Sequence, residues 1–379
     1  MPPGAKVTLL ESLTRIKDPR VKRTQRHKLI DILAIAVLGT ICGADSWVDI
    51  ADYGAAKESW LRGFLELPNG IPSHDTFGRV FARLDPDQFR ACFMDWVQTV
   101  KKLTRGQVIA IDGKTLRRSH DSLTGQAAIH MVSAWATANH LALGQVKVNA
   151  KSNEITAIPR LLRLLDVSGC IVTIDAMGCQ REIAEQIIKQ KGDYLLAVKE
   201  NQEGLHERIK TLFECVENAD YAQIEHEGTC GTVGKDHGRI EIRRCWVLSA
   251  DRHILSAQGN SFWSGLRSLV KIVCERRIGA QRSLETRYYI SSLSGNARQI
   301  LQAARNHWRI ENELHWSLDV AFREDDCRVR KDHAPENLAI LRHLVLSLLK
   351  QESTAKCGLK GKRLKAAWDE AYLLKVLEV

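Results

Sequence analysis

The chain has 379 residues, 44% of them hydrophobic and 26% charged, which excludes a collagenous or intrinsically disordered protein and is typical of a soluble globular one. Its formal net charge of +10 favours a polyanionic partner, nucleic acid first. The most apolar run, LIDILAIAVLGTICGA, contains Asp31 and is shorter than the ~20 residues of a membrane span, so we predict a buried helix and no membrane partner. Ten cysteines without a C-x-x-C pair fit a reducing compartment, and we predict a cytoplasmic protein.

Residues 1–105 are predicted to form an all-α N-terminal domain, because apolar residues recur there at helical spacing. Ser73 and the Asp85-Pro86 pair are start signals for two consecutive helices, which resemble a helix-turn-helix pair. Residues 1–30 also carry eight Lys and Arg against Glu11 and Asp18. We therefore predict that this domain binds DNA; the alternative is a basic end that is merely solvated.

Residues 106–199 change to the two-residue period of strands and then alternate with helices. The predicted order is β-β-β-α-β-α-β, with the first strand ending in QVIAIDG and the fourth in GCIVTIDAMG. Three meandering strands followed by α/β crossovers are typical of a ribonuclease-H-like fold. We therefore predict a mixed α+β protein with a ribonuclease-H-like catalytic core over residues 106–350.

A mainly β insertion is predicted within that core at about residues 200–295, where strand-like runs are separated by Gly, Ser and Asn turns. One long helix is then predicted over residues 294–322. Residues 351–379 are predicted to form a basic C-terminal helix or tail, since residues 355–366 carry five basic residues and no acidic one.

Two aspartates end apolar strands, and they are the first candidates for chemistry. In the predicted fold the first and fourth strands are adjacent and parallel, so Asp112 and Asp175 would lie side by side. Two carboxylates at that proximity are costly unless a cation lies between them, and such oxygen ligands suit Mg²⁺ or Mn²⁺. Each aspartate alone could instead be a cap or turn residue, and Asp175, followed by Ala-Met-Gly and a helix, fits that alternative.

Glu311 is the third candidate carboxylate. Helical spacing puts it on one stripe with an aromatic ring and two histidines, the stripe being Ala304, His307/Trp308, Glu311, His315 and Leu318. Further along the chain stand three rival acids that we interpret as a solvated acidic turn paired with Arg323 and Arg328: Glu324, Asp325 and Asp326.

Three carboxylates can hold two metal ions for an in-line phosphoryl displacement, so we predict a site with two Mg²⁺ or Mn²⁺ ions. The basic residues that follow the first aspartate could hold the phosphate backbone; these are Lys114, Arg117 and Arg118. The alternative is an exposed basic turn.

At these residues the chain resembles the DDE transposases of bacterial insertion sequences, and more closely the H-repeat-associated proteins. The resemblance rests on IPSHDTFGRVFARLDP, IAIDGKTLRRS, VTIDAMGCQ and HWRIENELHWSLDVAFREDDCRVR, and it runs from about residue 8 to 350. It implies a DDE triad of Asp112, Asp175 and Glu311. It also implies a helical N-terminal region that recognises the terminal inverted repeats of the element.

The sequence departs from relatives that carry a Tyr-x-x-Arg-x-x-x-Glu-x-x-x-x-x-x-Lys signature around the glutamate. Here these positions hold Ala304, His307, Glu311 and Leu318, so only the glutamate is kept. DNA contacts could come instead from His307, Arg309 or His315. Trp308 is a candidate to stack on a base, with packing in the core as the alternative.

The sequence therefore predicts a transposase that acts on double-stranded DNA, both the repeats and the target, as a homodimer and without a small-molecule substrate. A catalytically silent DNA-binding relic of such an element is the alternative. A ribonuclease or repair nuclease on the same fold is disfavoured, because it would need neither the helical domain nor the β insertion.

Overall fold

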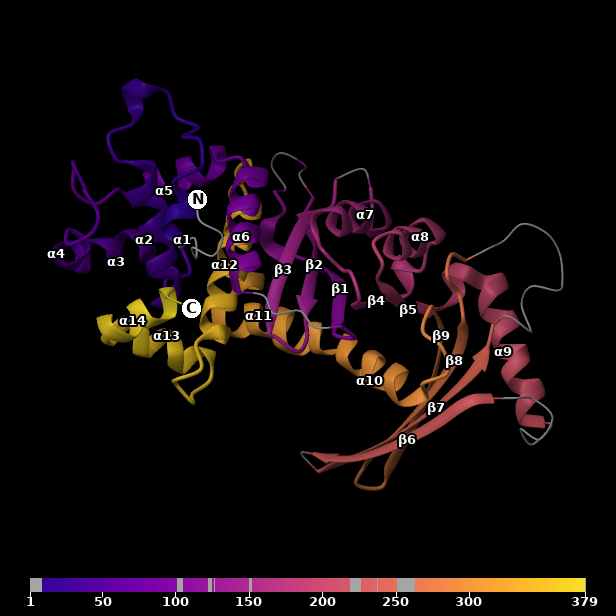
Figure 1. The fold of residues 1–379 in the computed structure, drawn as a ribbon. Coiled ribbons are helices and arrows are strands. Elements are labelled where there is room, and N and C mark those ends of the chain that lie inside the picture. The colour runs from indigo at the N-terminus through magenta and orange to yellow at the C-terminus, as the bar shows by residue number, and fades with distance from the viewer. Residues whose placement is uncertain are drawn as a thin grey trace. The chain divides into compact units, whose positions relative to one another are not determined.

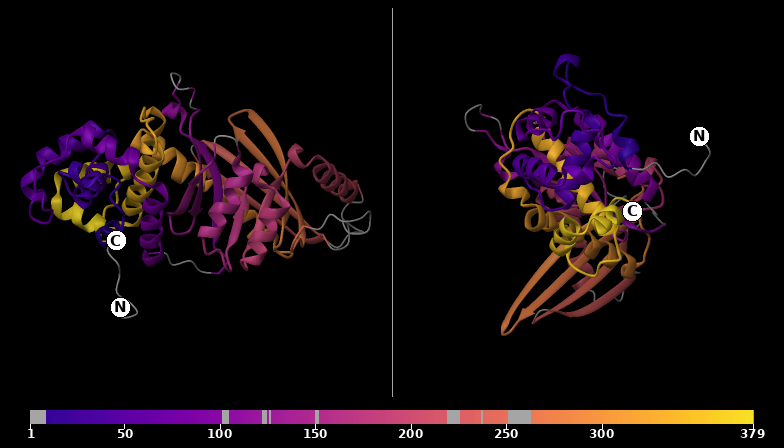
Figure 2. Two further views of the ribbon diagram at one scale, coloured as in Figure 1. Left: turned by 90° about the horizontal axis from the view of Figure 1, so that it is seen from above. Right: turned by 90° about the vertical axis from the view of Figure 1, so that its left-hand side faces the viewer.

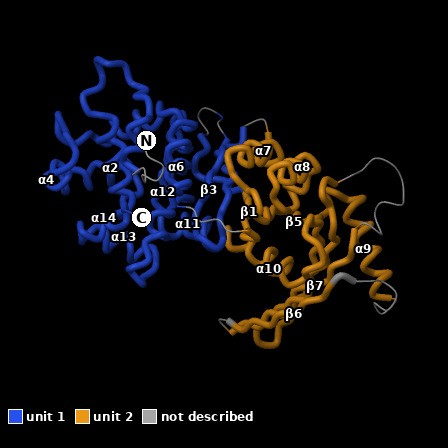
Figure 3. Tube along the Cα trace, in the orientation of Figure 1, with its two compact units in different colours: residues 1–102, 113–151, 311–379 blue, residues 103–112, 152–310 orange. Residues whose placement is uncertain are grey.

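The computed structural model forms two compact units, coloured separately in Figure 3. The first unit holds residues 1–102, 113–151 and 311–379, and the second holds 103–112 and 152–310. The chain passes from one unit to the other four times, after residues 102, 112, 151 and 310. The residues that the structure describes are 9–100, 105–121, 125, 127–149, 152–218, 226–236, 238–250 and 263–378. Residues 1–8, part of the predicted basic N-terminal segment, and parts of the predicted insertion lie outside them.

The described N-terminal region is helical, as predicted (Figure 1). The apolar run became α2, whose residues are buried from Asp31 to Ile41. Asp31 is tolerated there because its carboxylate accepts the backbone N–H of Leu67 at 3.0 Å. The helices of this region are α1 (Leu9–Leu13), α2 (Leu29–Ile41), α3 (Trp47–Ala56), α4 (Glu58–Leu61), α5 (His74–Arg83) and α6 (Pro86–Val100).

The first unit is completed by a hairpin and by C-terminal helices. Strands β2 (His130–Ala136) and β3 (Leu141–Lys147) are antiparallel, and His140 turns between them with a positive φ of 52°. Helices α6 and α12 pack against β3, and α12 is buried over almost its whole length. The C-terminal helices are α11 (Trp316–Phe322), α12 (Ala334–Gln351), α13 (Leu359–Trp368) and α14 (Glu370–Leu377).

The second unit is built on strands with helices on both faces. In Figures 1 and 2, α7 and α8 cover one face and α10 covers the other. The core under α10 includes Val108, Ile171 and Leu195, which alternate along their strands with residues of the opposite face. The strands are β1 (Val108–Thr115), β4 (Ile171–Ile174), β5 (Asp193–Val198), β6 (His226–Asp236), β7 (Arg239–Ser249), β8 (Ser268–Ile278) and β9 (Gln281–Ser291), and the helices are α7 (Glu154–Leu164), α8 (Arg181–Lys189), α9 (Glu203–Asn218) and α10 (Ala297–His307).

The strands pair as one large mixed sheet, in the order β3-β2-β1-β4-β5-β9-β8-β7-β6. Strands β1, β4 and β5 are parallel, whereas β9, β8, β7 and β6 continue the sheet by antiparallel pairing. The predicted mixed α+β class is therefore confirmed. The division into domains at residues 105 and 350 stays a prediction. No helix in the described part of the chain is both long and apolar enough to cross a membrane.

The helix predicted over 294–322 is interrupted. Helix α10 ends at His307, a π-helical turn follows over Ile310–His315, and α11 begins at Trp316. Such π-helical turns are rare and occur frequently at functional sites. The interruption falls on the segment that carries the candidate glutamate.

Candidate active site

The two candidate aspartates come from neighbouring parallel strands of the second unit. The register of β1 and β4 pairs Val108 with Ile171 and continues to Ile111 with Ile174. The next residue on each strand path is Asp112 on one side and Asp175 on the other. Both strands are apolar and buried up to that point. The two carboxylates therefore follow the hydrophobic runs at matching positions, as the sequence predicts.

Asp175 also has the capping role that was its alternative. Its Oδ1 accepts the backbone N–H of Met177 at 3.1 Å and of Gly178 at 3.4 Å, which caps the short 3-10 turn Ala176–Gly178. Burial raises the pKa of Asp175, and the negative charge of Glu154 adds to the rise. A carboxylate held by main-chain donors yet penalised by burial is one that a bound cation would stabilise.

Glu311 lies in the π-helical turn of the first unit, and 60% of its side chain is exposed. The ring of His315, which is almost fully buried, places Nδ1 3.2 Å from Glu311 Oε2. This hydrogen bond lowers the pKa of Glu311, and the charge of Lys114 contributes in the same direction. Glu311 is therefore held in its ionised form by the residue that helical spacing placed beside it.

The donor types fit a hard divalent cation. Glu311 and His315 of the first unit offer a carboxylate and an imidazole that could hold a metal ion, and Asp112 of the second unit offers a further carboxylate. Carboxylate oxygens suit Mg²⁺ and Mn²⁺, and Mn²⁺ also accepts an imidazole nitrogen. Asp112 and Asp175 lie in the second unit and Glu311 lies in the first, so the joint binding of a metal ion by the three acids stays a prediction.

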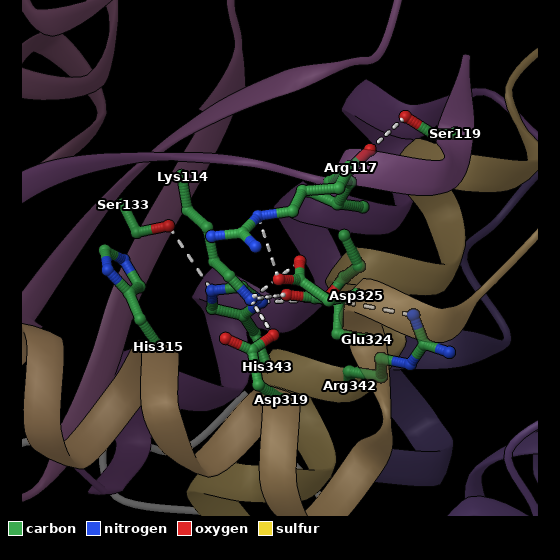
Figure 4. Close-up of polar contacts among 12 residues, drawn as sticks. Lys114, Arg117, Ser119, Ser133, His315, Asp319, Glu324, Asp325, Arg342 and His343 are labelled. Carbon is green, nitrogen blue, oxygen red and sulfur yellow. Dashed lines mark hydrogen bonds and ion pairs between the residues drawn. The ribbon is translucent and has the colours of Figure 1, made fainter.

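Lys114 is the centre of a buried ion cluster in the first unit (Figure 4). Its Nζ lies 3.1 Å from Glu324 and 3.7 Å from Asp325, and it also donates to Asp319. The Lys114 side chain is only 12% exposed. Although burial opposes its charge, the carboxylates of Glu324 and Asp319 raise the pKa of Lys114.

Glu324 was predicted to belong to a solvated acidic turn, and that prediction is wrong. Its side chain is 1% exposed and lies between Lys114 and Arg342, whose NH1 is 3.9 Å away. Burial alone would raise the pKa of Glu324, but the charges of these two cations hold it below its ordinary value. Asp326 matches the prediction better, since it lies on the surface 3.3 Å from Arg323.

The predicted phosphate-binding residues are not equivalent. Lys114 is engaged by carboxylates, whereas the side chains of Arg117 and Arg118 are 79% and 48% exposed. Arg117 still lies 3.3 Å from Asp325, and Arg118 lies 3.8 Å from Asp326. The three basic residues are thus tied to the acidic segment that follows Phe322.

The residues before the glutamate lie in the second unit. His307 Nδ1 is 3.1 Å from Thr173 Oγ1, two residues before Asp175, which fixes the end of α10 to β4. Trp308 is 47% exposed and its ring stacks under the guanidinium of Arg287 at 4.3 Å. Arg309 is partly buried. Trp308 is therefore not a core residue, and its role in stacking on a base stays a prediction.

Two features of the site were missed in the sequence. Asp319 and Arg342 complete the cluster around Lys114, and neither stood out. The one available signal was helical spacing, which puts Asp319 four residues after His315 on the stripe of Glu311.

Two family descriptions match this chain. Residues 10–97 match the family described as DDE_Tnp_1-associated, and residues 103–348 match the Transposase DDE domain. The second match covers most of the chain and includes every candidate acid. The chain therefore belongs to the DDE transposase family.

Full-length relatives place it more closely. It is 42% identical over 373 residues to "Putative protein YbfL" and to "H repeat-associated putative transposase YhhI", both of Escherichia coli (strain K12), with 97% of each chain covered. These matches indicate a transposase of the H-repeat-associated group. Among solved structures, the piggyBac transposase synaptic complex with hairpin DNA aligns with a TM-score of 0.41 and 9% identity, over 99% of this chain and 80% of that chain.

Proposed function

We propose that this protein binds the terminal inverted repeats of its own insertion sequence, hydrolyses phosphodiester bonds at those ends and joins the 3′-hydroxyl ends to target DNA. Asp112, Asp175 and Glu311 are the proposed catalytic acids and metal ligands. The observation that carries the proposal is the register of β1 and β4, which brings the two aspartates to matching positions on adjacent parallel strands. The reaction class follows from the family.

A ribonuclease-H-like core is part of the proposal. The strand order β3-β2-β1-β4-β5, with β2 and β3 antiparallel and β4 and β5 parallel to β1, supports it. The four long antiparallel strands β6–β9 then correspond to the β insertion that precedes the glutamate.

The protein's own residues orient the acids. The N–H groups of Met177 and Gly178 fix one oxygen of Asp175 and leave its other oxygen for a ligand. His315 fixes one oxygen of Glu311 and keeps it ionised. When bound, two Mg²⁺ or Mn²⁺ ions would supply an activated water or 3′-hydroxyl and stabilise the leaving oxygen.

DNA is the proposed partner on both sides of the reaction, as repeat and as target. Arg117 and Arg118 are proposed to contact phosphates because their guanidinium groups are at the surface. Lys114 is proposed to act on the same DNA-binding surface indirectly, because it holds the carboxylate of Glu324 in place. Residues just before the glutamate are the remaining proposed contacts: His307, Trp308 and Arg309. His315, predicted to contact DNA, is almost fully buried and holds Glu311 instead. A homodimer is proposed because two ends of an element must be brought together. The nucleoid is its proposed location because DNA is its proposed partner.

The proposal is tested by cleavage of a labelled duplex that carries the DNA flanking the gene, with Mg²⁺ or Mn²⁺. Asp112→Asn, Asp175→Asn and Glu311→Gln should abolish cleavage and leave binding of the duplex unchanged. Asp166→Asn is the matched control, because Asp166 is an exposed aspartate of the second unit. A wild-type protein that binds the ends but never cuts under either metal contradicts the proposal and favours a silent relic.

A further inference from the structure

A hollow of about 680 Å³ opens on the first unit next to the ion cluster, with Arg342 common to both. Its walls come from the start of α3, from α5 and from residues 323–334. This volume is within the range of about 300–1,000 Å³ that is typical of ligand sites. None of the candidate catalytic residues lines it.

The walls of the hollow are held in place by packing and hydrogen bonds. The Trp47 ring packs on Phe81 with centroids 4.8 Å apart. The N–H of His333 donates to the carbonyl of Ala82 at 3.2 Å, which ties the third wall to α5. The side-chain amide of Asn337 donates to the carbonyl of Phe81 at 2.8 Å. A ligand would therefore meet a preformed surface.

The acids of the hollow already have partners within the chain. Asp45 pairs with Arg363 at 2.8 Å, and Asp326 pairs with Arg323 at 3.3 Å. Asp49 accepts the N–H of Ser46 at 2.9 Å, and Asp75 lies 3.6 Å from His74.

The cations of the hollow are different. Arg79, Arg328 and Lys331 are exposed and form no ion pair with any described carboxylate. Six basic and four acidic side chains line the hollow, so it presents a net positive charge to a ligand, which favours an anion.

The hollow also has an apolar side. It is lined by the ring of Trp47, by Val329 and by Val48, whose side chain is 50% exposed. A ligand that satisfies both sides carries a negative charge next to a planar apolar group, and a nucleotide has this chemistry. In a duplex the faces of the bases are stacked on one another, so a paired base could not lay its face against Trp47.

We propose that this hollow binds one unpaired nucleotide of a DNA strand, with its base against Trp47 and Val48 and its phosphates on Arg79, Arg328 and Lys331. The inference rests on the proposed function only for the choice of DNA as the strand. It adds a nucleotide site that the catalytic acids do not form.

A second hollow supports a strand rather than a free nucleotide. It measures about 700 Å³, shares Arg79 with the first, and has no acidic residue among its described lining residues. Its cations include Arg23, Arg26 and Arg83. Arg79 of α5 thus lines both basic hollows. A strand whose base enters the first hollow would have its neighbouring phosphates over the second.

The test compares two labelled single strands of equal length in EDTA, one with bases and one abasic. The wild-type protein should bind the strand with bases roughly 5- to 100-fold tighter, as expected for stacking of a base. Val48→Glu should remove this preference, because it places a negative charge at an exposed position in the hollow. Arg328→Gln with Lys331→Gln should weaken both strands by the same factor and reduce the dependence on salt.

Two matched controls keep the test specific. Val233→Glu changes another exposed valine, and Lys375→Gln changes another exposed lysine; neither should alter binding. Free thymidine monophosphate should compete far more weakly than the strand. Equal binding of the two strands by the wild type, or loss in the controls equal to that in the hollow variants, overturns the inference. Because the binding test is run in EDTA, it is independent of cleavage. A protein that cleaves the repeats but shows no preference for the strand with bases contradicts only the nucleotide site. A protein that shows this preference but never cleaves contradicts only the proposed function.

Discussion

A partly buried and a fully buried carboxylate of this protein, Asp175 and Glu324, have opposite electrostatic surroundings. Asp175 accepts main-chain N–H groups, and burial raises its pKa. Glu324 is buried more deeply, yet Lys114 and Arg342 hold its pKa low. The fold compensates the charge of Glu324 with its own cations, whereas burial outweighs the more weakly acting charge of Lys199 at Asp175, for which we proposed a metal ion as the partner. If Asp175 is catalytic as proposed, the two acids differ in what neutralises them: cations of the fold for Glu324 and a bound metal ion for Asp175.

Removing the cation at the centre of the cluster is the strongest test of this difference. Lys114→Met should lower the free energy of unfolding by about 3–5 kcal/mol, because Glu324 would remain buried, and Asp319 partly buried, without their main cation. Chemical denaturation measures the change. Lys375→Met, at an exposed lysine, should change stability by less than about 0.5 kcal/mol.

A second variant separates charge from packing in the same cluster. Adding Glu324→Gln to Lys114→Met removes the carboxylate that the first change left unpaired, so part of the lost stability should return. If Glu324→Gln lowers the free energy of unfolding by the same amount in the Lys114→Met background as in the wild type, the two residues do not compensate each other.

Acid should weaken the fold through a neighbouring group. His343 is buried, with Nδ1 2.8 Å from the carbonyl of Ala339, and burial lowers its pKa to about 4. The unfolded imidazole titrates near ~6.5, so between about pH 6.5 and 4 the unfolded chain binds more protons than the folded one. The free energy of unfolding should therefore fall as the pH drops through this window, by roughly 3 kcal/mol.

His343→Gln should flatten that dependence, measured as the unfolding midpoint in denaturant at a series of pH values. His74→Gln is the control, since the His74 side chain is 57% exposed. Glu324 adds to the loss only below about pH 4, because its folded pKa is also depressed. A variant with the wild-type slope would show that His343 is not the titrating group.

The smallest expected effect concerns a cation held by a ring at the surface. Arg287 lies 4.3 Å from the centre of the Trp308 ring and also pairs with Glu285 at 2.7 Å. A double-mutant cycle of Arg287→Gln and Trp308→Leu should give a coupling of about 0.5–1 kcal/mol. No measurable coupling would mean that the Trp308 ring and the Arg287 guanidinium do not interact in solution.

The sequence was most informative where the chemistry follows local patterns. Continuous apolar runs predicted strands β1 and β4 up to Asp112 and Asp175, because a strand buried on both faces reads as such a run. Helical spacing predicted the contact between Glu311 and His315. Both inferences needed only neighbours along the chain.

The remaining features depend on residues far apart in the chain. Glu324 is followed by two further acids and looks solvated, but its partner Lys114 is 210 residues away. The π-helical turn at Ile310–His315 contains no Gly or Pro that would have signalled a break. The hollow beside Trp47 is formed by segments almost 300 residues apart, and no local pattern announces such a surface.

The most direct test of the central distinction is a titration of the protein with Mn²⁺, followed by the electron paramagnetic resonance signal of the free ion. Asp175→Asn should weaken Mn²⁺ binding at least about 10-fold, because it removes a negatively charged ligand. The double variant Lys114→Met with Glu324→Gln, if folded, should bind Mn²⁺ as the wild type does. Wild-type affinity in Asp175→Asn, together with lost affinity in the folded double variant, would contradict the account and assign the metal to the acids around Lys114.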